Sequence, residues 1–293
     1  MEAYLLRYAG YQKEFSIYAK NYANGLRTHP SILGESIKYS FLNEGKRIRP
    51  VLALATAEFL GLEKEEILPF ALALEMIHTY SLIHDDLPSM DNDDFRRGRP
   101  SNHKAFGEAN AILAGDGLLN EAYAICFQVC KKGMSYIEAS CYLNECAGVF
   151  GMIAGQSADL EFSKRENDCT EEELLYLYAN KTGKLLLAPL LTASILKGRK
   201  YYNELERFGK LLGTLFQMTD DILDETGDFQ ELGKNTGKDK ALNKCTCVRL
   251  FGLEGALERA KLCAENCHEI LDRMEGDTSF FHTLVENVLR RKF

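Results

Sequence analysis

The sequence predicts an all-α protein, a single domain of long and mostly antiparallel helices. Apolar residues recur at helical spacing nearly throughout the 293 residues, and only six prolines interrupt the pattern. No segment alternates apolar and polar residues between turn signals, as strands of a half-buried sheet do. Hydrophobic residues make up 46% of the chain, which is ample for a core. No linker or repeat divides the chain, so we expect one domain over residues 1–293.

The first third of the chain is predicted to hold four helices. The first covers about residues 2–24, and Ser31 is a candidate cap for the second. A basic turn at 45–50 precedes an apolar helix over 51–60. The next helix, over about 65–86, is apolar on nearly all of its faces, which predicts a central position.

The remaining helices are predicted from the same periodicity. In chain order they are two short helices within 105–133, then single helices over 134–160, 171–196 and 203–224, and closing helices from 249 onward. Gly115-Asp116-Gly117 is the expected break within 105–133, because glycine weakens a helix. Thr170 and Glu173 match a capping box at the start of the helix over 171–196.

Charge and cysteine content limit the classes of function. The net charge of −8 and the pI of about 5.4 argue against nucleic acid as the main partner, because phosphate-backbone binding needs a basic face. The nine cysteines include no C-x-x-C pair, so we expect free thiols in a reduced cytoplasmic protein rather than a zinc site. The longest uncharged apolar run, 185–196, is too short to span a bilayer, so membrane insertion is not expected.

An acidic cluster followed by a basic one occupies residues 84–100. Its charged members are Asp85, Asp86, Asp91, Asp93, Asp94, Arg96, Arg97 and Arg99. An acidic cluster at the end of a buried helix is costly unless something neutralises it, and Mg²⁺ binds carboxylate oxygens that it often shares with phosphates. Guanidinium groups match phosphate oxygens. The pattern predicts a metal and phosphate site, with a solvated acidic loop as the alternative.

A second acidic cluster ends the helix over 203–224. Asp220 and Asp224 are four residues apart and share a face with Gln217. Like charges at this spacing repel, and a helix C-terminus disfavours anions, so the pattern indicates a site rather than local stability. Two such clusters predict metal ions that hold a diphosphate, with its apolar tail in a cavity. Such a site favours cleavage of a carbon–oxygen bond to diphosphate.

Other polar residues lie where they could serve the same site. The basic turn 45–50 precedes a helix start, which predicts either a phosphate cradle or a basic surface loop. His78 lies seven residues before Asp85, close to two helical turns, and so shares its face. Lys181 and Thr182 interrupt an apolar helix, where they either snorkel to solvent or face a polar cavity.

Five segments together resemble the trans-isoprenyl diphosphate synthases, and within them the bacterial-type farnesyl diphosphate synthases. They are Gly45-Lys-Arg-Ile-Arg-Pro50, the D-D-x-x-x-x-D motif of Asp85 to Asp91 with Arg96-Arg97-Gly98, Lys181-Thr182-Gly183, the D-D-x-x-D motif of Asp220 to Asp224, and Gly233-Lys234 with Lys244. A single D-D-x-x-D is a weak signal. All five in this order are specific, and they run through nearly the whole chain.

The resemblance implies an isoprenoid synthase fold, with long helices around a deep central cavity, and usually a homodimer. The implied reaction condenses isopentenyl diphosphate with an allylic diphosphate, dimethylallyl or geranyl, to farnesyl diphosphate. It proceeds by metal-assisted ionisation, attack by the alkene and loss of a proton. The implied cofactor is Mg²⁺, as three ions, with Mn²⁺ as an alternative. No side-chain nucleophile is implied.

The resemblance also implies a role for each matching residue. The implied Mg²⁺ ligands are Asp85, Asp91, Asp220 and Asp224, supported by Asp86 and Asp221. The implied isopentenyl diphosphate site is Gly45, Lys46, Arg49, His78 and Arg97. The allylic diphosphate is implied to contact Arg96, Lys181, Lys234 and Lys244. Oxygen dipoles of Thr182 and Gln217 are implied to stabilise the carbocation.

Product length and catalytic competence have named alternatives. Tyr80, five residues before Asp85, is expected to form the cavity floor and to limit the product to fifteen carbons. Geranylgeranyl diphosphate synthases of closely similar sequence are the main alternative. A non-catalytic, partner-binding homologue usually loses aspartates from one motif, and a terpene cyclase usually replaces the second motif. Both motifs are intact here, which favours the synthase.

Overall fold

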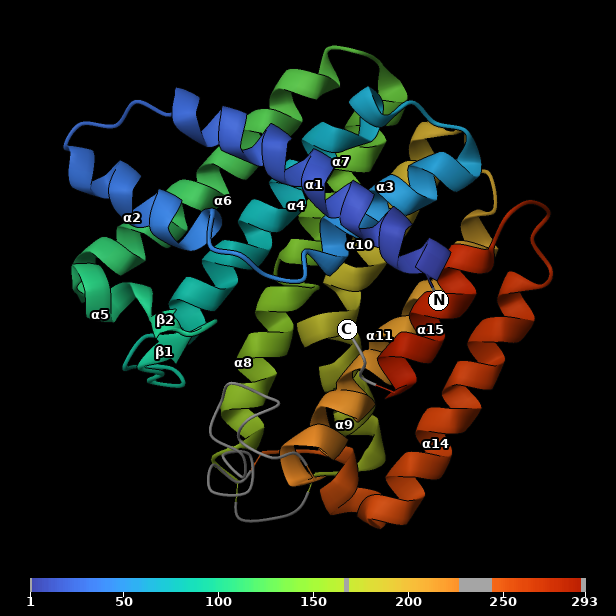
Figure 1. Cartoon of the computed structure of the whole chain (residues 1–293). Helices are drawn as coiled ribbons and strands as arrows, with labels where there is room; N and C mark the ends of the chain where they lie inside the picture. The colour runs from blue at the N-terminus through green and yellow to red at the C-terminus, as the bar shows by residue number, and fades with distance from the viewer. Residues whose placement is uncertain (1, 166–168, 227–243, 291–293) are drawn as a thin grey trace. The chain divides into compact units, whose positions relative to one another are not determined.

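The computed structural model describes residues 2–165, 169–226 and 244–290 (Figure 1). Across these ranges the chain is helical, except for one short antiparallel hairpin formed by β1 (Phe95–Arg96) and β2 (Arg99–Pro100). The predicted all-α class is therefore confirmed. Residue contacts group the chain into two compact units. The N-terminal unit comprises Glu2–Cys141 with Ile195–Gly198, and the C-terminal unit comprises Tyr142–Ser194 with Arg199–Phe293. One domain over residues 1–293 stays a prediction.

The N-terminal unit is built around helix α4. In chain order its helices are α1 (Glu2–Gly25), α2 (Ser31–Phe41), α3 (Ile48–Leu60), α4 (Lys64–Asp85), α5 (Asn102–Phe106), α6 (Glu108–Cys130) and the first part of α7 (Met134–Ala147). Helix α4 packs against α6, α3, α1 and α2, as its apolar faces predict. It is the one described helix long and apolar enough to cross a membrane, yet 72% of its apolar window is buried inside the protein.

Two expectations for helix starts and breaks in this unit are wrong. Ser31 is the first residue of α2 rather than its cap, because Pro30 occupies the capping position. Helix α6 is continuous through Gly115 and Gly117. A Cβ at Gly115 would lie 2.2 Å from the His84 ring, and one at Gly117 would lie 3.1 Å from the Ile37 side chain. These glycines therefore serve close helix packing instead of breaking the helix.

The C-terminal unit is organised around helix α11. Its elements are α8 (Met152–Phe162), α9 (Glu171–Leu177), the π-helix η1 (Tyr178–Gly183), α10 (Lys184–Leu196), α11 (Tyr202–Thr226), α14 (Cys247–Leu271) and α15 (Ser279–Arg290). Helix α11 packs against α14, η1 and α15, and α11 and α14 run side by side in Figure 1. Phe208, Phe280 and Phe281 lie in its core.

Three predictions for helices of this unit can be compared with the structure. The single helix expected over 134–160 is wrong, because a turn that contains Gly148 and Gly151 separates α7 from α8. The helix expected over 171–196 is interrupted by η1. The capping box is confirmed, since Thr170 Oγ1 accepts from the Glu173 amide at 3.2 Å and Glu173 Oε2 accepts from the Thr170 amide at 2.9 Å.

The expectation that every cysteine is free is also wrong. Cys169 and Cys245 form a disulfide, with Cα atoms 5.8 Å apart, and the other seven cysteines are free. Each of the two directly precedes a helix N-cap, Thr170 of α9 and Thr246 of α14. The fold brings these two helix starts together across 76 residues of sequence, which no local spacing indicates. The cysteine pattern thus loses its force as an argument for a reduced protein, and a cytoplasmic location stays a prediction.

Candidate active site

The basic turn before α3 contains one arginine that serves the fold. Arg47 is buried and donates to Glu75 Oε1 at 2.6 Å. It also donates to the backbone carbonyls of Phe41 at 2.7 Å and Asn43 at 2.9 Å. The neighbouring Lys46 carbonyl accepts from Tyr8 and Gln12 of α1, at 2.6 and 2.8 Å. These bonds fix the turn, and they explain why Arg47 is not available to a ligand.

Four of the residues predicted to bind isopentenyl diphosphate lie together in the N-terminal unit. The Arg97 guanidinium covers Gly45 so closely that a Cβ there would lie 2.7 Å from Arg97 Cζ. Arg49 is buried, and its Nε has no hydrogen-bond partner among the described residues. Burial lowers the pKa of Arg49 to about 10, with Glu75 opposing and Arg97 adding to the shift. An orphaned buried donor of this kind fits an absent anion.

His78 lies next to these arginines. Burial first, and then the nearby positive charges of Arg49 and Arg97, lower the pKa of His78 well below its ordinary value. The imidazole is therefore neutral at pH 7 and can donate one hydrogen bond without adding a charge. The structure thus brings together Gly45, Arg49, His78 and Arg97, while the Lys46 side chain lies on the exposed side of the turn.

The first aspartate motif is a loop that folds back on the end of α4. The Asp91 amide donates to the Asp85 carbonyl at 2.9 Å, so two aspartates six positions apart become neighbours. The Asp93 amide likewise donates to the Asp86 carbonyl at 3.2 Å. Asp85 and Asp91 are partly exposed, whereas Asp86 is buried. The loop therefore brings the backbones of its first and third motif aspartates together.

Asp86 serves as the partner of Arg96. Its carboxylate accepts from Arg96 Nε at 3.0 Å and from a terminal guanidinium nitrogen at shorter range. Burial raises the pKa of Asp86, and Arg96 opposes that shift. Arg96 also lies 3.5 Å from Asp93. The contacts agree with a supporting role for Asp86, and a contact of Arg96 with the allylic diphosphate stays a prediction.

The second aspartate motif, on α11, also has a buried middle aspartate between two more exposed ones. Asp220 is exposed and Asp224 is partly exposed, whereas Asp221 is buried. Asp221 accepts from the Tyr178 hydroxyl, from the Cys247 amide at 2.8 Å and from Gln217 Nε2 at 3.2 Å. Burial raises the pKa of Asp221 to about 7, although these three donors oppose it. The middle aspartate of each motif is thus buried and held by protein donors, whereas the aspartates on either side of it are more exposed.

The π-helix η1 places Lys181 and Thr182 beside α11 and α8. Thr182 Oγ1 donates to Gln217 Oε1 at 2.8 Å, and Lys181 pairs with Asp159 of α8. A Cβ at Gly155 would lie 2.2 Å from the Lys181 amide nitrogen, so this glycine lets α8 approach η1. Short π-helical stretches are frequent at functional sites.

Several contact residues were not found from the sequence, and one predicted residue cannot be placed. Asp159, Tyr178 and the Cys247 amide hold site residues but belong to none of the five segments. Gly155 and Asp159 are four residues apart on one helix face, but this spacing does not indicate a contact with Lys181. Lys234, with Gly233, lies outside the described residues.

The donor set of the aspartate motifs fits Mg²⁺ bound jointly with a phosphate. Among the described residues, no three His, Cys, Asp or Glu side chains lie close enough together to hold a metal ion by themselves. Mg²⁺ usually takes only one or two carboxylates and completes its octahedral shell with water and substrate phosphates. Each motif offers oxygen donors in that number. A structural zinc site would need four soft or nitrogen ligands instead.

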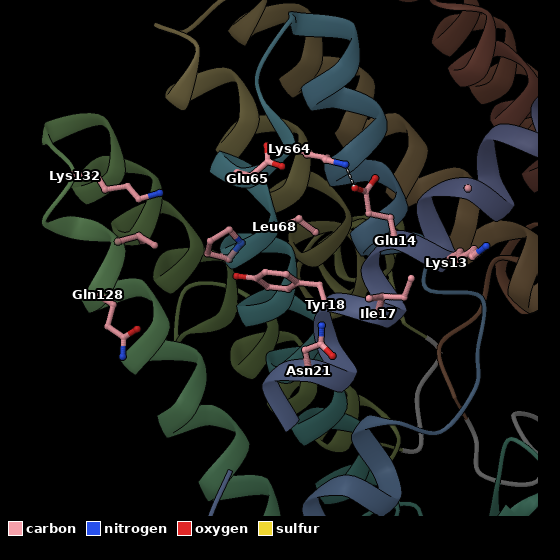
Figure 2. Close-up of a pocket in the computed structure, with 13 residues that line it drawn as sticks. Lys13, Glu14, Ile17, Tyr18, Asn21, Lys64, Glu65, Leu68, Gln128 and Lys132 are labelled. Atoms are coloured by element: carbon pink, nitrogen blue, oxygen red, sulfur yellow. Dashed lines mark ion pairs between the residues drawn. The ribbon is translucent and has the colours of Figure 1, made fainter. Parts of the chain in front are cut away.

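One groove of the N-terminal unit lies away from these residues. It has a volume of about 790 Å³ and is lined by α1, the start of α4 and the end of α6 (Figure 2). Leu68 and Val129 contribute apolar surface, and Lys64 on its rim is paired with Glu14. None of its lining residues belongs to the five segments. This groove is therefore not part of the predicted site.

The comparison with protein families shows which family the chain belongs to. A family profile described as Polyprenyl synthetase matches residues 30–279. The chain belongs to this family. It is 42% identical over 270 residues to the farnesyl diphosphate synthase of Geobacillus stearothermophilus, with 89% of each chain covered. It is 43% identical over 246 residues to geranylgeranyl pyrophosphate synthase 7 of Arabidopsis thaliana, covering 83% of this chain and 71% of that one.

The fold of this polyprenyl synthetase agrees with solved structures. The geranyltransferase of Helicobacter pylori, complexed with magnesium and isoprenyl diphosphate, superposes with a TM-score of 0.85 at 32% identity. The superposition covers 98% of this chain and 97% of that one. The predicted resemblance and the isoprenoid synthase fold are thereby confirmed. The roles of individual site residues stay predictions.

Proposed function

We propose that this polyprenyl synthetase is a Mg²⁺-dependent prenyltransferase that condenses isopentenyl diphosphate with dimethylallyl and geranyl diphosphate to form farnesyl diphosphate. The observation that carries the proposal is the cluster of Gly45, Arg49, His78 and Arg97 in the same unit as a complete first aspartate motif. A terpene cyclase has no second diphosphate to bind and no use for this cluster. A non-catalytic homologue has no reason to keep both motifs.

The cluster around Arg49 is suited to a diphosphate that stays intact. Two guanidinium groups, Arg49 and Arg97, supply positive charge in a fixed fork geometry. The unpartnered Nε of Arg49 and the neutral ring of His78 supply further donors. The diphosphate of isopentenyl diphosphate is not cleaved in the reaction, so its site needs binding and orientation rather than activation of a leaving group.

The aspartate motifs are suited to the diphosphate that leaves. Mg²⁺ held by Asp85 and Asp91 and by Asp220 and Asp224 would stabilise the charge of the departing diphosphate. Lys181 and Lys244 would hold the same oxygens with ammonium groups. Asp86 and Asp221 keep the motif backbones in place through Arg96 and Tyr178.

The orientation of Thr182 suits a neighbouring carbocation. Its hydroxyl hydrogen is directed to Gln217 Oε1, so the lone pairs of Thr182 Oγ1 remain for an electron-poor carbon. Gln217 is held in turn by its Nε2 bond to Asp221. The Thr182 and Gln217 dipoles are therefore fixed before ionisation, which is the condition for electrostatic stabilisation without reorganisation.

Product analysis is the direct test of this proposal. Purified protein would be incubated with Mg²⁺, isopentenyl diphosphate and dimethylallyl diphosphate, and the dephosphorylated products sized by chromatography. We expect a fifteen-carbon alcohol, with no product when EDTA removes the metal. A twenty-carbon alcohol would support the geranylgeranyl alternative, which the Arabidopsis relative also suggests. No product from either dimethylallyl or geranyl primer would favour the non-catalytic homologue.

We also propose that two copies associate through one side of α6. Helix α6 exposes Leu113 to 55% and Phe127 to 73%, and the two lie fourteen residues apart, close to four helical turns. Large apolar side chains that stay exposed on one side of a helix are candidates for an interaction surface. We expect Phe127→Glu to convert a dimer into the 33.0 kDa monomer in light-scattering chromatography. Leu6→Glu, which alters a similarly exposed residue of α1, is the control, and a monomeric wild type would refute the proposal.

A further inference from the structure

We propose that Asp159 is a positioning residue that holds Lys181 and Lys244 together for the allylic diphosphate, an inference that rests on the proposed function. Asp159 Oδ2 accepts from Lys181 Nζ, and Lys244 Nζ lies 3.9 Å from the same oxygen. The carboxylate is nearly buried, with 9% of its side chain exposed. One oxygen thus serves two ammonium groups that come from distant parts of the sequence.

The backbone around this contact is fixed at three points. Gly155 lets α8 approach η1, which sets Asp159 against Lys181. Lys244 is followed by Cys245, which is bonded to Cys169 at the start of α9. The next two residues are Thr246, which caps α14, and Cys247, whose amide donates to Asp221. Lys244 is therefore tied to the segment that holds the second aspartate motif.

A shared carboxylate solves an electrostatic difficulty of the site. Two ammonium groups that must bind one diphosphate repel each other before it arrives, and the repulsion is strong where water is partly excluded. Asp159 offsets this repulsion and limits the rotamers of both lysines. A diphosphate with Mg²⁺ carries more negative oxygens than a single carboxylate, so it can recruit the lysines without a large rearrangement.

The same contacts allow two roles for Asp159, and these roles predict opposite changes in allylic diphosphate binding when the carboxylate is removed. If Asp159 only competed with the diphosphate for the lysines, its removal would tighten allylic diphosphate binding. If Asp159 positions the lysines, its removal weakens that binding. The isosteric substitution Asp159→Asn removes the charge, retains the shape and so separates the two effects.

We expect Asp159→Asn to raise the KM for geranyl diphosphate about tenfold, in the range seen when supporting residues of a site are replaced. The KM for isopentenyl diphosphate should stay unchanged, because its proposed site is formed by Arg49, His78 and Arg97 rather than by Asp159 and its lysines. The kcat should change much less than the KM for geranyl diphosphate. Asp159→Glu should recover part of the loss. An unchanged or lower KM for geranyl diphosphate would overturn the proposal.

Two controls tie the effect to the lysines. In the background of Lys181→Ala, adding Asp159→Asn should cost clearly less than it does in the wild type, because one of the two lysines it acts through is gone. Full additivity would show that Asp159 acts by another route. Glu161→Gln changes a neighbouring acid of α8 that pairs with exposed Arg165, and it should leave all kinetic constants unchanged. Circular dichroism melting would confirm that each variant is folded.

Calorimetric titration with Mg²⁺ and inorganic pyrophosphate tests the inference independently of turnover. Asp159→Asn should weaken pyrophosphate binding to a similar extent, and Lys181→Ala should remove most of the difference between the two forms. A wild type that makes no product but shows this binding difference would refute the proposed reaction and retain the positioning role. If the wild type makes product but Asp159→Asn binds pyrophosphate as tightly as the wild type does, the proposed reaction is retained and the positioning role is refuted.

Discussion

Replacing Asp85 with alanine is expected to lower kcat about a thousandfold or more, with the protein still folded. Asp85 ends α4, and the Asp91 amide closes the motif loop on its carbonyl at 2.9 Å. The backbone pairing survives the substitution because it uses main-chain atoms. What is lost is one of the two carboxylates of the first motif that we propose as metal ligands. Stabilisation of leaving-group charge by a metal is worth several kcal/mol, and about 1.4 kcal/mol is a tenfold change in rate.

The measurement is steady-state turnover of geranyl and isopentenyl diphosphate over a range of Mg²⁺ concentrations. We expect the defect in Asp85→Ala to shrink only partly at high Mg²⁺, since the geometry of the site depends on the missing ligand. Asp94→Ala is the matched control. Asp94 belongs to the same acidic run, but its carboxylate is exposed and pairs with Lys104 at 2.8 Å. Near-normal turnover of Asp85→Ala would contradict the metal assignment.

Helix positions were predictable from the periodicity of apolar residues. Whether a glycine within such a pattern ends the helix was not predictable. Gly115 and Gly148 both lie in helical patterns, and glycine weakens a helix in either place. At Gly115 the absent side chain makes room for His84 of α4, and the helix continues. At Gly148 and Gly151 the helix ends. Tertiary neighbours decide between the two outcomes, and a single sequence does not contain them.

The candidate site shows the same limit at the level of side chains. Arg47 and Arg49 are two residues apart in one basic turn and look alike in the sequence. Arg47 is used by Glu75 and backbone carbonyls, whereas Arg49 retains a buried donor without a partner. The aspartates of the two motifs could be found from their spacing in the sequence. Asp159 belongs to none of the five segments, and only the fold brings Lys181 and Lys244 to it.

Replacing Tyr80 with alanine is expected to lengthen the product from fifteen carbons to twenty or more while ionisation continues. Tyr80 lies on α4 five residues before Asp85, and its side chain is buried with 6% exposure. Its ring packs edge-on against His84, with centroids 5.7 Å apart. A ring held by packing at the end of the substrate tail would stop growth by sterics, and alanine would remove the obstacle.

The matched control is Tyr80→Phe, because the Tyr80 hydroxyl has no hydrogen-bond partner among the described residues. A buried hydroxyl without a partner contributes no stabilising bond, so its loss should leave folding stability unchanged or slightly higher. The phenylalanine ring keeps the obstacle, and the product should stay at fifteen carbons. Chromatography of the dephosphorylated products from both variants gives the answer. If the alanine variant still stops at fifteen carbons, the floor of the cavity is another residue. If both variants lengthen the product, the limit depends on the hydroxyl rather than on the volume of the ring.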